Sequence, residues 1–303
     1  MKTSVIIPSY NPTLKLQETL DKLVPQARFI DELIIIIDNN NYSDFANSIV
    51  GKYSAALKIK IHSQPNSGRA ISRNKGVEVS SGDIIIFLDD DMLAEKDLIE
   101  KHIQYHLKNS DSIVSGNGYR NPENANAKND FEKFLVNMEN RWRENTINTG
   151  EITFNNFNFT ACNMSIPKNI FERLGGFDSR FSDGEDFDFA VRGLNTGIRI
   201  YYDNTLNAWH NDWSDIKAII SRQKEYTNAK KEIFRIHPNY LKYFAYMLPK
   251  EYGWYKKLIA SIFKSPLIWF VNSGNSIFAS LPLKIKFILY DLTITSNTIT
   301  KNN

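Results

Sequence analysis

Short apolar runs alternate along residues 1–90 with segments whose apolar side chains recur at helical spacing. The apolar runs occupy residues 3–7, 33–37, 57–61 and 84–88. β-branched residues dominate these runs and polar residues do not alternate with them, which is typical of strands buried on both faces. The segments with helical spacing lie between the runs, at residues 14–24, 44–54 and 68–79. This order predicts a mainly parallel sheet whose strands are joined by right-handed helical crossovers.

Residues 94–236 continue the mixture of helices and strands in a less regular order. Helices are expected at residues 94–107, 131–145, 168–174, 184–194 and 215–236. Strands are expected at residues 112–118, 154–166, 198–202 and 206–209. The polar stretch NPENANAKND, at 121–130, is the best internal boundary. We therefore separate residues 1–120, 121–236 and 237–303, and expect one α/β domain over the first two ranges with a helical extension after them.

The composition is that of an ordinary globular protein and excludes several classes. Of the 303 residues, 42% are hydrophobic and 23% are charged, and the net charge of +3 is too small to indicate nucleic-acid binding. Cys162 is the single cysteine, so an internal disulfide framework and a CxxC metal site are excluded and a reducing compartment is expected. Pro8 interrupts the first apolar run too early for a signal peptide, and no uncharged stretch reaches transmembrane length. We therefore expect a cytoplasmic protein.

Polar side chains follow three of the predicted strands at the point where each strand ends. They are Ser9–Asn11, Asp38–Asn40 and Asp89–Asp91. The carboxyl ends of parallel strands meet at one edge of a sheet, where α/β proteins bind ligands such as nucleotides. Three adjacent carboxylates repel one another unless a cation or a set of donors neutralises them, so Asp89, Asp90 and Asp91 favour a divalent metal site. The alternative is an acidic cap of the next helix, although a cap needs only one Asp.

Four further positions are candidates whose structural and functional interpretations both stay open. Arg73, on the helix expected at 68–79, can pair with a phosphate or a rim aspartate, or lie on the surface of a packed helix. Glu185 and Asp186 begin a predicted helix, whose dipole would lower their pKa and keep Asp186 ionised as a general base. When such a pair stands alone, acidic residues at a helix start are more often there for structural reasons. His210 follows a strand and suits a metal ligand, whereas a lone histidine is more often structural.

Two single residues remain. Asp38 suits the ribose or base of a nucleotide, or an Asx turn into the asparagine-rich loop that follows. Cys162 has no base placed beside it by the sequence, and we expect a buried, inert thiol.

Taken together and in this order, these segments resemble the inverting glycosyltransferases of family 2, which have the GT-A fold. The resemblance covers about residues 1–215 and includes the strand that ends at Asp38 and the segment around His210. The other matching segments are SVIIPSYN, NSGRAISRNKG, GDIIIFLDDDM, CNMSIP and GGFDSRFSDGEDFDFAVRG. The loop DNNNYSD departs from the tighter acidic-Gly-Ser turn that is usual in the family, and residues after 236 have no match.

The resemblance implies a three-layer α/β/α fold around a mainly parallel mixed sheet. Residues 1–120 would bind a nucleotide-sugar donor, expected to be a UDP-sugar, and residues 121–236 would bind the acceptor and complete the catalytic site. Asp89 and Asp91 would be the outer members of a DXD motif. The nucleotide-binding residues would be Pro8, Tyr10, Asp38, Arg73, Asp89 and Asp90. The ligands of a Mn²⁺ or Mg²⁺ ion would be Asp91, Asp89 and His210.

The same resemblance implies that Asp186 is the catalytic base and that Glu185 contacts acceptor or donor. The chemistry agrees, because a cation stabilises the leaving diphosphate and a carboxylate must take the proton of the acceptor hydroxyl. The function expected is metal-dependent inverting glycosyl transfer to a saccharide or lipid-linked acceptor in bacterial cell-surface polysaccharide synthesis, such as that of capsule or O-antigen.

Two other functions remain as alternatives. A sugar-nucleotide nucleotidyltransferase shares the sheet and the acidic edge, but it would need a glycine-rich basic loop after the first strand, where this chain has PSYNP. A catalytically inactive protein that binds nucleotides or other proteins is disfavoured because the acidic residues and His210 are all present.

The aromatic residues suggest two further roles. The acceptor pocket is expected to use Trp142, Phe154, Phe157 and Phe159, which would serve equally well in a core. Residues 240–290 mix Trp254, Tyr255, Trp269 and Phe270 with lysines. This segment is either an interfacial element that brings the protein to the inner face of an anionic membrane, or a helical extension that packs on the domain or forms a dimer contact.

Overall fold

The computed structural model describes residues 1–121, 127–146, 150–248, 258, 260–261, 270–271 and 276–298. The chain divides into two compact units, and each is described by itself. The first unit contains Met1–Arg120 and Thr146–Asn211, and the second contains Asn121–Asn145 and Asp212–Asn303. The first division falls at the predicted polar linker, whereas the residues after 145 return to the first unit until Asn211. The assignment of donor and acceptor binding to residue ranges stays a prediction.

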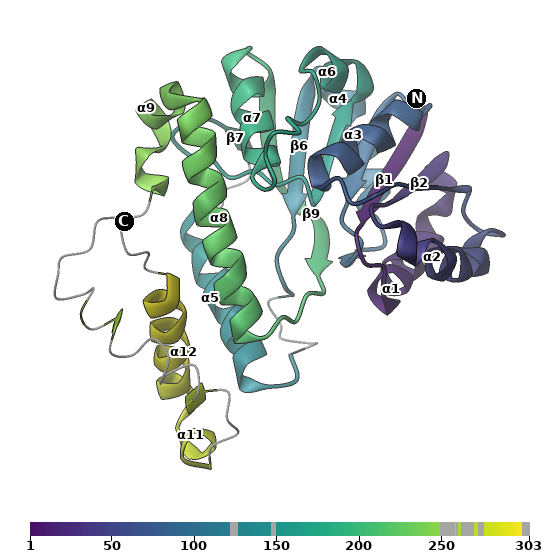
Figure 1. Cartoon of the computed structure of the whole chain (residues 1–303). Coiled ribbons are helices and arrows are strands. Elements are labelled where there is room, and N and C mark those ends of the chain that lie inside the picture. The colour runs from purple at the N-terminus through teal and green to yellow at the C-terminus, as the bar shows by residue number, and fades with distance from the viewer. Residues whose placement is uncertain are drawn as a thin grey trace. The chain divides into compact units, whose positions relative to one another are not determined.

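The first unit is built on a sheet of nine strands (Figure 1). Its order is β3 (Ile59–Ser63), β2 (Glu32–Ile37), β1 (Thr3–Ser9), β4 (Ile84–Leu88), β8 (Asn163–Pro167), β6 (Ser112–Asn117), β9 (Arg199–His210) and β5 (Met92–Ala94), with β7 (Gly150–Ile152) also paired to β9. The first four strands of this order, β3, β2, β1 and β4, are parallel to one another, as predicted. β6 is parallel to β9. β8 is antiparallel to both of its neighbours, and β5 and β7 are antiparallel to β9, so the sheet is mixed.

Helices cover both faces of this sheet and make the three layers that were predicted. One face packs against α1 (Leu14–Leu23), α2 (Ser43–Val50) and α4 (Leu98–Lys108). The other face packs against α3 (Arg69–Val79), α6 (Lys168–Arg173) and α7 (Glu185–Asn195). Short 3-10 turns connect some of these elements, at η1 (Val24–Phe29), η2 (Asn40–Tyr42) and η3 (Gly51–Tyr53).

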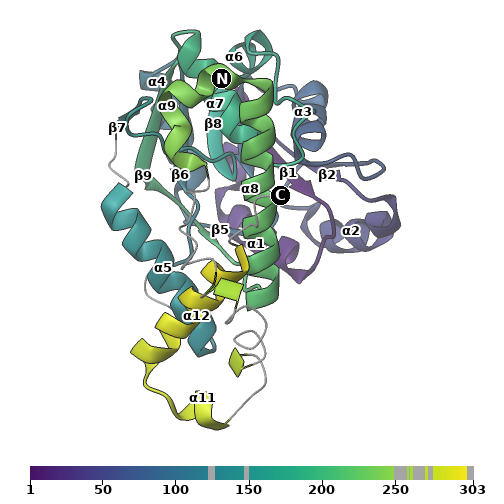
Figure 2. The same ribbon diagram turned by 60° about the vertical axis from the view of Figure 1, so that its left-hand side comes forward.

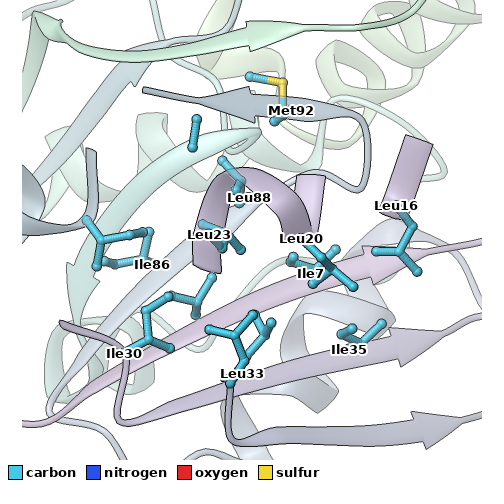
Figure 3. Close-up of a cluster of buried hydrophobic side chains, with 14 of the residues drawn as sticks. Ile7, Leu16, Leu20, Leu23, Ile30, Leu33, Ile35, Ile86, Leu88 and Met92 are labelled. Atoms are coloured by element: carbon cyan, nitrogen blue, oxygen red, sulfur yellow. The ribbon is translucent and has the colours of Figure 1, made fainter. Parts of the chain in front are cut away.

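The strands are buried on both faces because successive side chains enter opposite cores. Ile7 and Leu33 pack with Leu20 in the core beneath α1 (Figure 3). Ile6 and Ile34 point into the core on the α3 side. α3 lies close on the sheet, since a Cβ at Gly76 would stand 2.3 Å from a side-chain carbon of Ile6. Gly76 therefore allows this close packing.

The second unit is helical where the structure describes it. Its elements are α5 (Asp130–Thr146), α8 (Ile216–Ile236), η4 (Pro238–Tyr240), α9 (Leu241–Phe244), η5 (Ala245–Met247), α11 (Ser276–Ser280) and α12 (Leu283–Thr298). Phe134 packs with Ile220 and Tyr290 in an apolar core, and Lys286 donates to Asp130 at 2.7 Å. No helix among the described residues is both long and apolar enough to cross a bilayer. Part of the stretch considered for membrane contact, including Trp254, Tyr255 and Trp269, lies outside the described residues.

Three predictions of local structure were wrong, each because of long-range pairing. The helix expected from residue 94 begins at Leu98, since Met92–Ala94 instead pairs with β9. The expected strand at 154–166 is reduced to β8, whose partners on both sides fix its start at Asn163. The two strands expected at 198–202 and 206–209 form one strand, β9, that passes through an irregularity.

Candidate active site

Acidic side chains gather at one edge of the sheet in the first unit. β1, β2 and β4 are parallel, so their carboxyl ends share this edge. β8 runs the opposite way and begins here, because Asn163 pairs with Leu88 and the N–H of Asp89 donates to the carbonyl of Cys162 at 3.1 Å. The sequence placed Asp38 and the three aspartates at one edge, and the strand order agrees with this placement.

Arg73 is the central cation of the edge. Its guanidinium is buried, with 3% of the residue exposed, and donates from one nitrogen to Asp89 at 2.7 Å and from another to Glu185 at 2.5 Å. Burial would lower the pKa of Arg73, but Asp89, Glu185 and Asp186 outweigh it and raise that pKa. Of the alternatives left open by the sequence, the structure shows the pairing with a rim aspartate. It also joins β4 to the first turn of α7, a link that spacing along the chain did not reveal.

Glu185 and Asp186 lie in the first turn of α7. Gly184 precedes them with φ of +75°, a left-handed conformation that suits glycine. Burial raises the pKa of both carboxyls: Arg73 opposes that rise at both, and at Asp186 the N–H groups of Ala161 and Phe187 oppose it too. The prediction that the helix dipole lowers their pKa was therefore wrong, because loss of water outweighs the dipole. Asp186 accepts hydrogen bonds from the N–H groups of Ala161 at 3.3 Å and Phe187 at 2.8 Å, and no cationic side chain among the described residues donates to it.

Asp91 and His210 form a second pair at the edge. His210 Nε2 lies 3.1 Å from Asp91 Oδ1. Pairing of β5 with β9 sets this neighbourhood, because Met92 stands opposite His210 and the N–H of Asn211 donates to the carbonyl of Asp91 at 2.8 Å. Burial would raise the pKa of Asp91, but His210 and Lys15 hold it below its usual range.

These residues can be tested for their fit to a divalent cation. Among the described residues, no group of three or more His, Cys, Asp or Glu side chains is arranged so that it could hold a metal ion. The 3.1 Å between Asp91 Oδ1 and His210 Nε2 nevertheless suits neighbouring ligands of an octahedral ion, which lie about 3 Å apart when each bond is about 2.1 Å. Carboxylate oxygen and imidazole nitrogen are also suitable ligands for Mn²⁺. Asp89, the third predicted ligand, is bound to Arg73 instead.

Asp90 lies along the chain between Asp89, the partner of Arg73, and Asp91, the partner of His210. Ser9 Oγ donates to its carboxylate, and Thr19 Oγ1 donates to its main-chain carbonyl at 2.9 Å. Burial raises its pKa to about 7: the Ser9 bond opposes this rise, while Asp91 and Asp89 add to it. Asp90 can therefore hold a proton near neutral pH, whereas Asp91 is ionised.

Asp38 holds a loop of its own chain. Its carboxylate accepts from the N–H groups of Ser67 at 2.9 Å and Gly68 at 2.8 Å, and from Gln64 Nε2 at 2.7 Å. These bonds fix the turn before α3, where Gly68 has φ of +92°. Neither of the two interpretations of Asp38 from the sequence included this role.

Pro8 and Tyr10 lie at the end of β1. Pro8 is the penultimate residue of the strand, and Tyr10 is 50% exposed just beyond it. Cys162 is half-buried, and burial raises its pKa to about 12, which agrees with an inert thiol. Phe157 and Phe159 pack partly buried against the core on the α7 side. The side chain of Trp142 lies outside the described residues.

Sequence reasoning missed a set of buried polar residues behind this edge. They are His102 and His106 on α4, and Asn163 and Ser165 on β8. The spacing of the two histidines, four apart on a predicted helix, was a signal that both would lie on one face. Their partners on β8 could not be read from spacing.

Comparison with known proteins identifies related chains. A family model described as "Glycosyl transferase family 2" matches residues 4–175. The "Probable glycosyltransferase YdaM" of Bacillus subtilis is 29% identical over 226 residues, which are 70% of this chain and 51% of that protein. The "Poly(ribitol-phosphate) beta-N-acetylglucosaminyltransferase TarP" of Staphylococcus aureus is 29% identical over 178 residues, 53% of this chain and 54% of that one. This chain thus spans about half the length of these curated relatives.

A solved structure shares the fold at low sequence identity. The mannosyltransferase PcManGT from Pyrobaculum calidifontis, in complex with GDP-Man and Mn²⁺, superposes with a TM-score of 0.60 at 14% identity. The match covers 98% of this chain and 86% of that one. It confirms the predicted α/β architecture.

Proposed function

Because the chain belongs to glycosyl transferase family 2, we propose that it moves a sugar from a nucleoside diphosphate donor to a hydroxyl group of a saccharide or lipid-linked acceptor, with inversion at the anomeric carbon. The observation that carries the proposal is Arg73, which joins Asp89 at the end of β4 to Glu185 at the start of α7. This bridge holds a second carboxylate, Asp186, beside the strand edge where α/β proteins bind nucleotides.

Asp186 is the proposed base. It has no side-chain cation bound to it among the described residues, and its raised pKa makes it a better proton acceptor than an ordinary aspartate. The carboxylate takes the proton of the acceptor hydroxyl as the oxygen bonds to the anomeric carbon. The bond from that carbon to the diphosphate breaks, and its electrons leave with the nucleoside diphosphate. Attack opposite the leaving group inverts the centre without a covalent sugar–enzyme intermediate.

Asp91 and His210 are the proposed ligands of a divalent cation, Mn²⁺ or Mg²⁺, with Asp89 as a further donor-side contact. The cation supplies positive charge that stabilises the departing diphosphate. Support comes from the 3.1 Å separation of the two ligand atoms and from the Mn²⁺ in the mannosyltransferase of the same fold. Glu185 is bound to Arg73, so its role is to hold the cluster rather than to transfer a proton.

The donor is proposed to be a UDP-sugar, with Tyr10 and Pro8 near the base and ribose. Asp38 shapes this side of the site through the loop at Ser67 and Gly68. Asp90 and Arg73 complete the donor side through their contacts with Ser9 and Asp89. The half-exposed Tyr10 side chain is available for stacking on a base.

The biological setting is proposed to be bacterial cell-surface polysaccharide synthesis, such as that of capsule or O-antigen. TarP, a relative over half of this chain, is named for transfer to poly(ribitol-phosphate), which supports a polymeric acceptor. Work at the inner face of the membrane, through residues 237–303, belongs to the same proposal.

The test is a donor screen with the purified full chain and Mn²⁺, reading release of free nucleoside diphosphate. Wild type should turn over at least one nucleotide sugar. Asp186→Asn should bind that donor within about twofold of wild type, yet lose about 100- to 10,000-fold in kcat, the usual contribution of a general base. Glu172→Gln, an exposed carboxylate on α6, is the matched control and should behave as wild type. Near-full turnover by Asp186→Asn would refute the assignment of the base.

A further inference from the structure

A polar layer separates α4 from β8 where apolar packing would be expected. It consists of His102, His106, Ser165 and Asn163, which are 0–2% exposed, and is called the polar seam below. Ser165 Oγ lies 2.8 Å from His102 Nδ1 and 2.8 Å from His106 Nε2. Asn163 Oδ1 lies 2.9 Å from His102 Nε2. Buried polar groups are costly without partners, and of the side-chain nitrogen and oxygen atoms of these four residues only His106 Nδ1 lacks one among the described residues.

The hydrogen-bond partners allow only one assignment of donors and acceptors along the polar seam. Asn163 Nδ2 donates both of its hydrogens, to the carbonyls of Asn117 at 2.8 Å and Leu206 at 2.9 Å. Its Oδ1 must therefore accept, which places the proton of His102 on Nε2 and leaves Nδ1 as an acceptor. Ser165 has one hydrogen and gives it to that Nδ1. His106 must then donate from Nε2 to the Ser165 oxygen, which fixes the tautomer of both rings.

Burial keeps His102 and His106 in these neutral tautomers at neutral pH. It lowers the pKa of His102 to about 4, although Asn163 and Asp203 oppose the shift. It also lowers the pKa of His106 to about 4, and the neighbouring His102 adds to that shift. Both rings are therefore neutral and single tautomers persist.

The seam ends at an irregularity in β9. Gly116 of β6 pairs with Asp203, but the next residue, Asn117, pairs with Asn207, so β9 carries extra residues between them. The two carbonyls that Asn163 binds belong to Asn117 on β6 and to Leu206, which lies within the irregular stretch of β9. These two strands are neighbours in the sheet (Figure 2). A Cβ at Gly116 would lie 2.5 Å from Asn163 Nδ2 and 2.6 Å from the Leu206 carbonyl oxygen. The hydrogen bond between these two groups therefore requires glycine at residue 116.

The break determines where β9 resumes and therefore where His210 lies. After it, β9 pairs with β5 through Ala208, Trp209 and His210. Side chains alternate between the faces of a strand, so a slip of one residue would turn His210 away from Asp91. At the break, Asn163 binds the main chains of β6 and β9 together, and Asn117 Nδ2 also donates to Asn207 Oδ1 at 3.3 Å. Beyond it, the N–H of His210 donates to the carbonyl of Tyr119 at 3.0 Å, and Trp209 Nε1 donates to Glu95 at 3.1 Å.

We propose that His102 is a positioning residue which, through Asn163, fixes the register of β9 and so holds His210 beside Asp91. The inference rests on the proposed function in that Asp91 and His210 are taken as the cation ligands. Its structural content, the tautomers and the place of His210, stands apart from that assignment.

The first measurement uses the ¹⁵N-labelled full chain and long-range ¹H–¹⁵N spectra of the imidazole rings. Both His102 and His106 should be protonated on Nε2 and should not titrate between pH 6 and 8. A proton on Nδ1 of His102 would overturn the proposal, whatever the variants do.

The second measurement compares His102→Phe, which keeps a ring but has no donor, with His102→Gln, whose amide N–H replaces Nε2–H. The Phe variant should shift the His210 ring signals and weaken Mn²⁺ binding by about 10- to 100-fold, the usual cost of losing a residue that orients a ligand. The Gln variant should restore both. His62→Phe, a histidine on β3 outside the seam, is the control and should change neither.

The outcomes separate the two proposals. A folded His102→Phe with unmoved His210 signals overturns the positioning role. If wild type binds no Mn²⁺, the cation site fails, and the His210 signals alone decide the inference. If His102→Phe does not fold, Ser165→Ala removes the hydroxyl that orients His102 and accepts from His106, and it should give a smaller shift of His210 in the same direction. An unmoved His210 there refutes the proposal.

Discussion

Two groups of acidic side chains meet at the same sheet edge but are neutralised in different ways. In the Arg73 cluster, a permanently charged guanidinium binds Asp89 and Glu185 directly, and Asp186 lies beside them. In the Asp91 cluster, the partner of the carboxylate is the imidazole of His210, which is a cation only when protonated. The first cluster therefore contains a permanent cation, whereas the second is the one proposed to bind an external cation.

This difference separates the cluster that stabilises the fold from the cluster that is proposed to bind a cation. A buried carboxylate without a cation is strongly destabilising, so the Arg73 cluster is part of the fold before any ligand arrives. The Asp91 cluster is held in place by backbone pairing of β5 with β9 rather than by its own charges. The positions of its proposed ligand atoms therefore depend on strand pairing.

Arg73→Met would break the comparison most strongly. It leaves Asp89 and Glu185 without their cation, and the free energy of unfolding should fall by about 3–5 kcal/mol, measured by urea denaturation. Arg69→Met, in the same helix, is the matched control. Arg69 is 40% exposed in its pair with Asp183, so its loss should cost about 1 kcal/mol or less. Equal stabilities of the two variants would show that the Arg73 cluster is not part of the structural framework.

Asp91→Asn should have a smaller effect, and on binding rather than folding. Loss of one carboxylate ligand should weaken Mn²⁺ binding by at least about tenfold, read by calorimetry, while the unfolding midpoint changes little. Asp97→Asn removes a carboxylate paired on the surface with Lys101 and should leave Mn²⁺ binding intact. Unchanged affinity in a folded Asp91→Asn would remove the cation from this cluster.

Asp90→Asn should have the smallest effect on stability, and the size of that effect should depend on pH. Its pKa is about 7 in the folded protein against about 3.9 in an unfolded chain, so between these values the folded state holds a proton that the unfolded state has lost. Asp90 therefore costs stability as pH rises from about 4 to 7. Allowing for solvent at this half-buried group, Asp90→Asn should gain about 1 kcal/mol, or about 2–4 °C in Tm, at pH 7.5 in chelator. The gain should vanish at pH 4, and an equal gain at both pH values would contradict the titration.

The sequence was sufficient for most of the strand–helix order in residues 1–90 and for the acidic edge. Buried strands such as β4 are marked by uninterrupted β-branched residues, and their parallel arrangement forces the following polar residues to one side. The sequence failed where pairing partners are distant. Met92–Ala94 has helical neighbours along the chain, yet its partner is more than a hundred residues later in β9.

The candidate site divides in the same way. The residue types and their order made candidates of Asp38, Arg73, the three aspartates, Glu185, Asp186 and His210. All of them except Arg73, which lies within a helix, were expected to follow a strand or to begin a helix. Only the tertiary structure shows which of them are in contact. Arg73 pairs with Asp89 and Glu185, and Asp38 accepts hydrogen bonds from the loop before α3. The direction of the pKa shifts at Glu185 and Asp186 also depended on burial, which the dipole argument from sequence left out.

The sequence by itself thus determined the family, the α/β order and the identity of the acidic residues, since these depend on local composition and periodicity. Only the tertiary structure decided the charge partners, the polar seam behind β8 and the register that sets His210 against Asp91. The physical reason is that ion pairing, desolvation and strand register depend on distances between segments far apart in the chain. Those distances exist only once the sheet has formed.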